Sequence, residues 1–410
     1  MNIAQSRASE SRNVLFLLLV VSCVTLLVGC DESGVVGGGF TDSDTTIKVD
    51  TLMVDGIETE SYNFYSGNLT YFTPGQFSDP LFGDMKVTGL LRPQLLSGSA
   101  EMAPDANMKL RLVFNQELVY GDTTQPAEYD IVELDQVWRG RAWKLHDEPG
   151  LSGNAPLASF TAEKEDSVDI PLSGSWVQSY RDYTQMEGAN RDSLYRIEFP
   201  GLALVPKNSA KLLPVDAQAS KFIIENPESD TLEVAPRDWA NSLERTNVPD
   251  TPDNTFKLHS TLEQVVSFDM DLTRENIGSV NLSKVELVLY EDTQRLENTM
   301  DQVSPTAGRG PISEARLQIL DPADVPISLQ TGSVLSNGSY NEEDGSYRFN
   351  ITSFTNSVLL DGLPSELKFY VSLETNNGII RSSLIHNEQA PEAKRPKLIV
   401  TYVKNQENTD

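Results

Sequence analysis

The feature that most constrains the fold of this chain is a series of short runs in which polar and apolar residues alternate. Residues 109–114 and 284–289 alternate in this way, and so do residues 195–199 and 367–371. Because successive side chains of a strand point to opposite faces, such runs predict strands with one buried and one solvated face. Long stretches of helical periodicity are missing, and turn pairs such as Asn337-Gly338 separate the runs. The sequence therefore predicts an all-β fold built from antiparallel sheets.

The predicted strands recur at a nearly constant spacing along the chain. The run around Leu110 matches that around Val285, 175 residues later, and residues 221–224 match residues 397–400, 176 residues later. Three further pairings follow the same order: Leu194 with Leu367, Ile170 with Ile351, and residues 85–95 with residues 263–272. A repeated order of strands indicates a duplication. We predict two tandem β-sandwich, jelly-roll-like modules, at residues 45–225 and 255–405, followed by a tail at 406–410.

The segment between the two predicted modules is rich in residues that favour loops. Residues 226–254 contain Pro227, Pro236, Pro249 and Pro252 together with several Asp and Asn residues. Proline cannot donate to a β-ladder and is rare inside sheets. We therefore predict that residues 226–254 form a linker.

The start of the chain resembles the signal peptide of a bacterial lipoprotein. Residues 14–27 are almost wholly apolar but too short to span a membrane comfortably, and two arginines precede them. The following residues, Leu27-Val28-Gly29-Cys30, resemble a lipobox. The resemblance implies that residues 1–29 are removed and that Cys30 carries diacylglycerol and palmitate. The alternative is a plain signal peptide or anchor helix that contains a cysteine by chance.

Residues 30–44 are predicted to tether the folded body to the membrane. Glycines at positions 34 and 37–39 favour a flexible linker. Asp31-Glu32 resembles the acidic signal that sends some lipoproteins to the cell surface, so we expect an outer-membrane protein anchored by lipid. Two alternatives stay open: the periplasmic face of that membrane, and retention in the inner membrane by Asp31.

Charge and cysteine content exclude several classes of function. The net charge of −28 opposes nucleic-acid binding, which needs a basic surface. It also repels anionic headgroups, so the lipid must hold the protein at the membrane. Of the two cysteines, Cys23 lies in the apolar part of the predicted signal peptide and Cys30 is the predicted lipid carrier. The mature chain would therefore have neither a disulfide nor a metal site built on cysteine.

Several loose motifs resemble an uncharacterised family of Gram-negative envelope lipoproteins. They are Phe-Ser-Asp-Pro-Leu-Phe-Gly at residues 77–83, Val-Tyr-Gly-Asp at 119–122 and Phe-Pro-Gly-Leu-Ala-Leu at 199–204. Residues 395–402, Arg-Pro-Lys-Leu-Ile-Val-Thr-Tyr, are similar to the last strand of DNRLRE-type modules, which are related to carbohydrate-binding β-sandwiches. The resemblance implies a β-sandwich and a binding function, and it transfers no catalytic residue.

The sequence has none of the common catalytic signatures. It lacks a P-loop, a nucleophile elbow and a dinucleotide fingerprint. His146, His259 and His386 are dispersed without metal-ligand spacing, and we expect them at the surface or in loops. We therefore predict that the protein is not an enzyme. With 60 acidic residues a catalytic carboxylate pair can still form, so a β-sandwich hydrolase is one alternative.

No cofactor is predicted, with a structural calcium ion as the open case. Three pairs of aspartates supply the oxygen ligands that calcium prefers: Asp42 with Asp44, Asp79 with Asp84, and Asp269 with Asp271. None of them fits an EF-hand loop. The last pair alternates with apolar residues and is also typical of the solvated face of a strand.

The densest aromatic and basic segment is Trp138-Arg139-Gly140-Arg141-Ala142-Trp143. Trp and Arg are enriched at binding hot spots, so Trp138, Arg139, Arg141 and Trp143 form our candidate ligand patch. The alternative is that one tryptophan is core and the arginines pair with carboxylates. A second stripe, Trp176, Tyr180 and Tyr183, has helical spacing and is expected to be core, with a sugar platform as the alternative.

These features predict a non-catalytic surface lipoprotein that binds a glycan or an outer-membrane protein. The first alternative is a structural accessory subunit of an outer-membrane secretion or transport assembly. The second is the hydrolase.

Overall fold

The computed structural model of the protein describes residues 45–96, 100–227, 231–270, 272–273, 277, 281–310, 312–325, 327–362, 367–373 and 377–405. The described chain is mostly β-structure, and its described strand pairs are antiparallel. The predicted all-β, sandwich-like fold is confirmed. Residues 49–402 form one compact unit, and the remaining described residues belong to a second unit with the chain ends.

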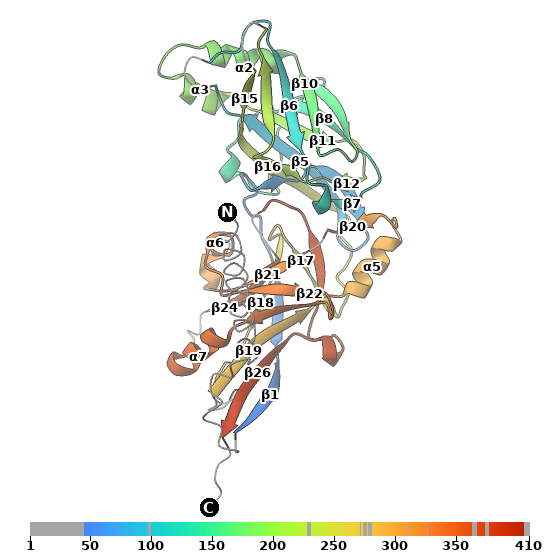
Figure 1. The fold of residues 1–410 in the computed structure, drawn as a ribbon, viewed down its shortest axis with the longest axis vertical. Coiled ribbons are helices and arrows are strands. Elements are labelled where there is room, and N and C mark those ends of the chain that lie inside the picture. Colours follow the sequence, from blue (N-terminus) through green and yellow to red (C-terminus); the bar gives the residue numbers. More distant parts are fainter. Residues whose placement is uncertain are drawn as a thin grey trace, which may run out of the picture. The chain divides into compact units, whose positions relative to one another are not determined.

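One large sheet carries most of the C-terminal half. Its nine strands run in the order β1-β26-β19-β23-β22-β21-β24-β18-β2 (Figure 1). Their bounds are β1 (Thr45–Met53), β26 (Lys397–Asn405), β19 (Asn281–Tyr290), β23 (Ser346–Asn350), β22 (Ser336–Asn341), β21 (Glu314–Leu320), β24 (Lys368–Leu373), β18 (Gln264–Asp269) and β2 (Asp55–Ser61). The consecutive strands β1 and β2 lie at opposite ends of this order, so one N-terminal segment covers both edges of the sheet.

The other half distributes its strands over two sheets. One has the order β15-β14-β6-β10, and the other contains β9-β8-β11-β5, with β16 on the free side of β5. Their bounds are β15 (Leu232–Val234), β14 (Lys221–Glu225), β6 (Asn107–Val113), β10 (Ser167–Leu172), β9 (Ala158–Ala162), β8 (Ala127–Glu133), β11 (Leu202–Pro206), β5 (Gly83–Pro93) and β16 (Pro236–Thr246).

Short strands extend or flank these sheets. In the sheet of β5 they are β4 (Gly75–Asp79), β12 (Lys211–Leu212), β7 (Tyr120–Asp122) and β20 (Ala307–Gly308). Two separate pairs are β3 (Tyr71–Phe72) with β13 (Val215–Asp216), and β17 (Thr255–His259) with β25 (Ser382–His386). The α-helices of the described residues are α2 (Ser175–Gln185), α3 (Arg191–Glu198), α5 (Thr293–Asp301), α6 (Ile327–Thr331) and α7 (Thr352–Asp361), and four single-turn 3-10 helices lie at Gln116–Leu118, Gly140–Ala142, Pro322–Asp324 and Glu392–Lys394.

The two halves share one strand order. The strands of the large sheet, from β1 to β2, match one by one the strands of the two sheets in the other half. The matching order is β15-β14-β6-β10 in one sheet, followed by β9-β8-β11-β5-β16 in the other. The same helix position recurs, because α2 follows β10 and α7 follows β23. This agreement is what a duplication predicts.

The predicted boundaries of the modules need correction. The segment 226–254 is no simple linker, because β16 pairs with β5 over most of its length and β15 pairs with β14. Conversely β1 and β2, predicted in the first module, pair with β26 and β18 of the second. Each half is thus closed by a strand pair of equivalent position, and the second half is discontinuous in sequence. Proline was a misleading signal here, since Pro236 begins β16 where the register is irregular.

One predicted strand is a helix. Residues 109–114, 284–289 and 367–371 lie mainly in β6, β19 and β24, as expected. Residues 195–199, by contrast, lie at the end of helix α3, which lies close to α2 in Figure 1. The match of Leu194 with Leu367 was therefore wrong, because the strand order makes β11 the equivalent of β24.

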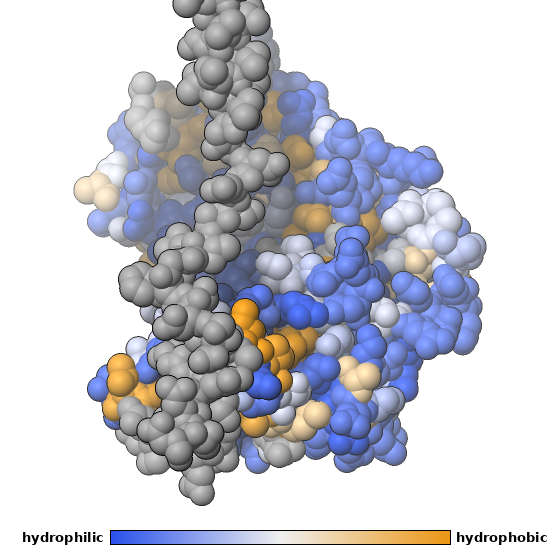
Figure 2. Space-filling view, turned by 60° about the horizontal axis from the view of Figure 1, so that its bottom comes forward, coloured by the Kyte–Doolittle hydropathy of each residue, from blue (hydrophilic) through white to orange (hydrophobic). Residues whose placement is uncertain are grey.

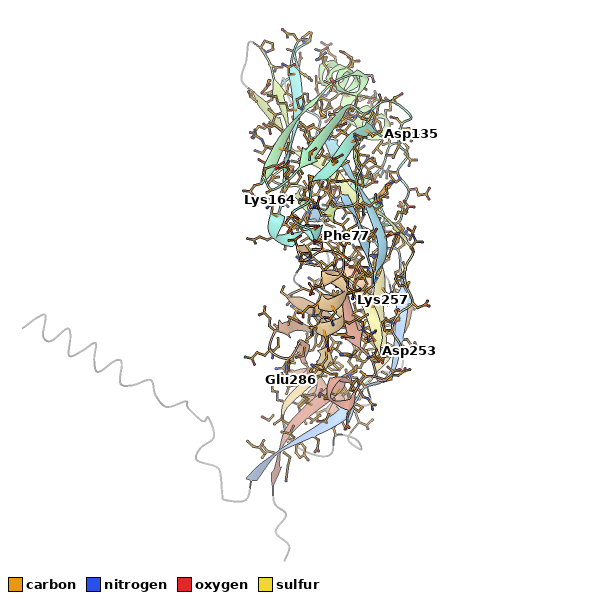
Figure 3. All side chains as sticks on the ribbon, turned by 90° about the vertical axis from the view of Figure 1, so that its right-hand side faces the viewer. Phe77, Asp135, Lys164, Asp253, Lys257 and Glu286 are labelled. Atoms are coloured by element: carbon orange, nitrogen blue, oxygen red, sulfur yellow. The ribbon has the colours of Figure 1, made fainter. Side chains whose placement is uncertain are left out.

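Five hydrophobic clusters occur among the described residues, and three of them matter here. The largest fills the first half and the second fills the large sheet. A third combines Phe77, labelled in Figure 3, with Met300 of α5 and Ile380, so it joins residues of both halves. The expected helix stripe is core, because Trp176 and Tyr180 are fully buried in the first cluster. The face drawn in Figure 2 is mainly hydrophilic with small apolar patches, in line with the acidic composition.

A candidate anion-binding site

A cavity of about 560 Å³ lies where β5, β16, helix α3 and the loop around Gly140 come together. It is lined by five arginines from four separate segments of the chain: Arg92, Arg139, Arg141, Arg196 and Arg237. Among the described residues, Asp238 is the single carboxylate of the lining, so the formal excess is four positive charges. We call it the arginine cavity.

The floor of the arginine cavity is a buried ion pair between neighbouring strands. Arg92 of β5 stands opposite Asp238 of β16 in the register, and its Nε donates to Asp238 Oδ2 at 3.0 Å. Its Nη1 donates to the carbonyl oxygens of Arg196 and Phe199, at 3.3 and 3.2 Å. Because most of its donors are used and its side chain is only 3% exposed, Arg92 is a structural element of the site.

A β-bulge aims Arg237 toward the cavity. The pairing of β16 with β5 shifts register between Pro236 and Asp238, which leaves Arg237 as the extra residue. A bulge locally bends the strand and redirects a side chain, and bulges are frequent beside functional sites. Arg237 Nε lies 3.3 Å from Asp238 Oδ2 without a hydrogen bond of good geometry. The guanidinium of Arg237 therefore keeps donors for a ligand.

The predicted ligand patch separates into a buried aromatic half and an exposed basic half. Trp138 and Trp143 are 4% and 8% exposed and pack edge to face with ring centroids 5.8 Å apart. They belong to a core cluster and are not part of the cavity lining, so a ligand in the cavity does not stack on them. Arg139 and Arg141 remain exposed and line the cavity, and no hydrogen bond or ion pair of either guanidinium occurs within the described chain. The alternative in which these arginines pair with carboxylates is therefore not what the structure has.

Gly140 allows the loop to approach the ion pair closely. Its N–H donates to Asp238 Oδ1 at 3.2 Å. A Cβ at this position would lie 2.3 Å from Asn68 Oδ1 and 2.9 Å from Asp238 Oδ1. Only glycine fits here without displacement of its neighbours, so Gly140 fixes where the two flanking arginines emerge.

Helix α3 supplies the remaining wall. Ser193, Arg196 and Ile197 have the i, i+3, i+4 spacing of one helix face, and all three are exposed. The opposite face packs Tyr195 and Phe199 into the aromatic core around Trp176. Within the described residues the guanidinium of Arg196 has no partner for its side chain. Its place in the site was missed because residues 195–199 were predicted to form a strand.

A second, smaller cavity adjoins the first. It measures about 150 Å³ and is lined by Gln94, Leu95, Asp192, Tyr195, Arg196 and Arg237. Arg196 and Arg237 thus line both cavities. Burial raises the pKa of Tyr195 well above its usual range, so its hydroxyl stays protonated and donates to the carbonyl of Pro93 at 2.7 Å.

An acidic cavity in the other half has a different character. It also measures about 560 Å³ and contains Glu291, Glu297, Asp301 and Glu342 with Arg309 and Tyr340. Burial raises the pKa of Glu291, as a hydrolytic acid would require. Its carboxylate, however, already accepts hydrogen bonds from Tyr340 and Ser383. The arginine cavity instead presents guanidinium donors that are not engaged, so we take it as the candidate site.

The predicted calcium and histidine positions fall in other environments. Asp79 binds Arg309 through both carboxylate oxygens and Asp84 accepts from Asn247, so this pair has other partners. Asp269 is exposed on β18, while Asp42, Asp44 and Asp271 lie outside the described residues. Within the described chain no cluster of three or more His, Cys, Asp or Glu side chains could hold a metal ion. The expectation for His259 was wrong, because it is buried on β17, where its neighbours exclude water.

The predicted lipobox and lipidation site lie outside the described residues. This applies to Leu27, Val28, Gly29 and Cys30, and to the signal peptide, the tether and the tail at 406–410. No helix within the described ranges is long and apolar enough to cross a membrane.

Comparison with known proteins gives no family assignment. No family model matches the chain, and no curated protein matches it. Among solved structures, the Macrobrachium rosenbergii nodavirus is 8% identical over 89% of this chain and 91% of that chain, with a TM-score of 0.17. The C-terminal domain of the Streptococcus pyogenes antigen I/II-family protein AspA is 10% identical over 84% and 96%, with a TM-score of 0.13. The VP2 subviral particle of infectious bursal disease virus is 9% identical over 88% and 77%, with a TM-score of 0.12. Scores this low carry no argument about the fold or function.

Proposed function

We propose that this protein is a non-catalytic lipoprotein of the bacterial outer membrane that binds an acidic glycan in the arginine cavity. The observation that carries the proposal is the concentration of five arginines in one concave site of a chain whose net charge is −28. A concave site of one sign of charge focuses its field and attracts ligands of the opposite sign. Guanidinium groups match carboxylates with two parallel hydrogen bonds.

The size and lining of the cavity support a ligand of the size of a sugar. Its volume of about 560 Å³ lies within the range of small-molecule sites, ~300–1,000 Å³. Three of the guanidiniums, those of Arg139, Arg141 and Arg196, are exposed and without side-chain partners in the described chain. An anionic ligand would relieve the repulsion among them and would gain charge-assisted hydrogen bonds.

Titration calorimetry on the full-length protein in detergent tests the proposal. We expect polygalacturonate to bind and neutral dextran not to bind, with affinity falling as salt is added. The double variant Arg139→Ala/Arg141→Ala should bind at least about tenfold more weakly, since hydrogen bonds to charged groups contribute ~1.5–3 kcal/mol. The control Lys86→Ala/Lys164→Ala removes the same charge elsewhere and should bind as the wild type does. Equal binding by both double variants would refute the proposed site.

Membrane attachment is tested separately. We expect Cys30→Ala to abolish lipidation and to release the protein from the membrane fraction, because the lipid is the proposed anchor. Detergent phase partitioning and fractionation measure this, with Cys23→Ala as the matched control. Protease treatment of intact cells then distinguishes the cell surface from the periplasmic face.

A further inference from the structure

The two adjoining cavities at the arginine site share a wall. Arg196 and Arg237 line both the cavity of about 560 Å³ and the one of about 150 Å³. A ligand that contacts the linings of both cavities must extend from one into the other past these two side chains. A single small anion would leave the smaller cavity unused.

The chemistry of the lining differs between the two cavities. Arg139 and Arg141 belong to the large cavity alone, and their planar donors suit a carboxylate. The small cavity adds the amide of Gln94 and the carboxylate of Asp192. Asp192 Oδ1 accepts from Arg191 Nε at 3.3 Å, while Oδ2 has no partner within the described residues, so both side chains can bind hydroxyl groups. Two hydrogen bonds fix the backbone of Gln94: its N–H donates to the carbonyl of Ala235, and its carbonyl accepts from the hydroxyl of Tyr180 at 2.8 Å. Its exposed side chain is therefore positioned on a rigid segment.

The lining also separates a saccharide from other anions. Among the residues that the structure describes, the lining of the large cavity has one large apolar side chain, Ile197, and no aromatic one. The cavity therefore offers a nucleotide base no aromatic side chain on which to stack. It also offers an acidic peptide no apolar pocket of the kind that usually holds an anchor residue. A ring that carries hydroxyl groups and a carboxylate finds partners for both kinds of group.

We infer that the ligand is an extended acidic oligosaccharide, with the carboxylate of one residue in the large cavity and the hydroxyl groups of the next residue in the small one. The inference rests on the proposed function and adds to it the ligand's length and its orientation across Arg196 and Arg237. Binding is therefore divided between charge recognition by Arg139 and Arg141 and hydroxyl recognition by Gln94 and Asp192.

The test compares ligand length in calorimetry on the full-length protein. The probes are galacturonic acid, linear trigalacturonate, maltotriose, inorganic phosphate and an acidic hexapeptide. We expect trigalacturonate to bind at least about tenfold more tightly than galacturonic acid, as one additional pair of hydrogen bonds implies. Gln94→Leu/Asp192→Asn should bring the ratio of the two affinities close to one. Arg139→Ala/Arg141→Ala should weaken both.

The outcomes separate the two levels of the proposal. If the trisaccharide and the monosaccharide bind equally, or if Gln94→Leu/Asp192→Asn has no effect on the trisaccharide, the extended ligand is refuted while the anion site stands. If phosphate or the peptide binds more tightly than trigalacturonate, the ligand is not a saccharide. If none of the anionic probes binds, the proposed function itself fails. Denaturation midpoints of all variants, equal to that of the wild type, would show that the comparisons concern binding.

Discussion

At the scale of single residues, the site depends on the close packing and hydrogen bonds of Gly140, Asp238 and Arg92. Gly140 lies against Asn68 and Asp238, and its own N–H satisfies one oxygen of the buried carboxylate. The other oxygen is held by Arg92. A buried charge is tolerated only when it is paired and hydrogen-bonded, so each of these contacts supports the next.

Replacing Gly140 by alanine should open this arrangement. The new Cβ would lie 2.3 Å from Asn68 Oδ1, which forces the loop or the carboxamide to move. We expect a loss of stability of about 1–3 kcal/mol, as overpacking usually gives, together with weaker anion binding. Gly153→Ala is the control, because a Cβ at Gly153 meets no atom within 4 Å. Chemical denaturation and calorimetry would measure both, and an unchanged midpoint for Gly140→Ala would contradict the packing argument.

Neutralising Asp238 should lower the free energy of unfolding more than neutralising a surface carboxylate does. Asp238→Asn leaves the guanidinium of Arg92, with a side chain 3% exposed, without its counter-charge. Breaking one partner of a buried ion pair costs about 3–5 kcal/mol. Asp169→Asn, whose pair with Arg111 is 41% exposed on each side, should have little effect. If the two variants unfold at the same denaturant concentration, the pair of Arg92 with Asp238 contributes nothing to the fold.

At the scale of elements, the run at residues 195–199 shows how packing selects between two periodicities. Tyr195, Ile197 and Phe199 alternate as in a strand, but Tyr195 and Phe199 are also four residues apart, as on one helix face. The structure buries these two aromatic residues and leaves Ile197 61% exposed, which is the helical outcome. The buried aromatic rings of helix α2 provide the surface that favours it.

The strand pair β1–β2 offers a test of how the second half is closed. It covers β26 at one edge of the large sheet and β18 at the other. Deleting residues 45–61 exposes both edges, and exposed edges favour aggregation. We expect the truncated protein to aggregate and to be cleaved by protease within residues 255–405, while residues 71–246 resist. Deleting residues 31–40 instead is the control. Equal protease resistance of both truncated proteins would contradict the role of β1–β2.

At the scale of the whole molecule, buried charges connect the two halves. Arg309 binds Asp79 of β4 at 2.8 and 2.9 Å, and Tyr120 donates to the same carboxylate at 2.7 Å. Arg245 of β16 forms a bidentate ion pair with Glu263, from Nε to Oε1 at 3.0 Å and from Nη2 to Oε2 at 2.7 Å. Together with the strand pairing of β20 with β7, these contacts join the duplicated halves through a polar seam.

This seam should make the protein sensitive to acid. Burial would raise the pKa of Glu263, but the charge of Arg245 outweighs it and holds that pKa well below its usual range. Burial also lowers the pKa of His259 from 6.5 to about 3. Below pH 6.5, His259 becomes protonated in the unfolded chain but stays neutral in the folded chain. Below pH 4.5, Glu263 becomes protonated in the unfolded chain but stays ionised in the folded chain. Stability is therefore expected to fall as the pH drops from 6.5 toward 3.

Denaturation midpoints between pH 7 and pH 4 would measure the effect. His259→Gln keeps a polar side chain near Ser382, the partner of the imidazole at 2.7 Å, and removes the titrating group. Its stability should depend less on pH between 6.5 and 4.5 than that of the wild type. An identical pH profile for the variant would show that His259 is not responsible.

The sequence by itself determined the class of the fold and the repeated order of its strands. Alternation in β6, β19 and β24 is a local property, because each side chain faces the core or the solvent according to its position in the strand. Only the tertiary structure decided that β1 and β2 belong to the second half and β15 and β16 to the first. The choice depends on which sheet has an unpaired edge strand, and the local sequence does not encode this.

The site was likewise decided by the tertiary structure. Arg139 and Arg141 were recognisable from their dense segment, but the role of the neighbouring tryptophans was not, because core and ligand-binding aromatics look alike in sequence. Arg92, Arg196 and Arg237 come from a strand, a helix and a bulge that are far apart along the chain. Charged residues follow no periodicity, and only the pairing of β5 with β16 and the packing of α3 bring these guanidiniums together.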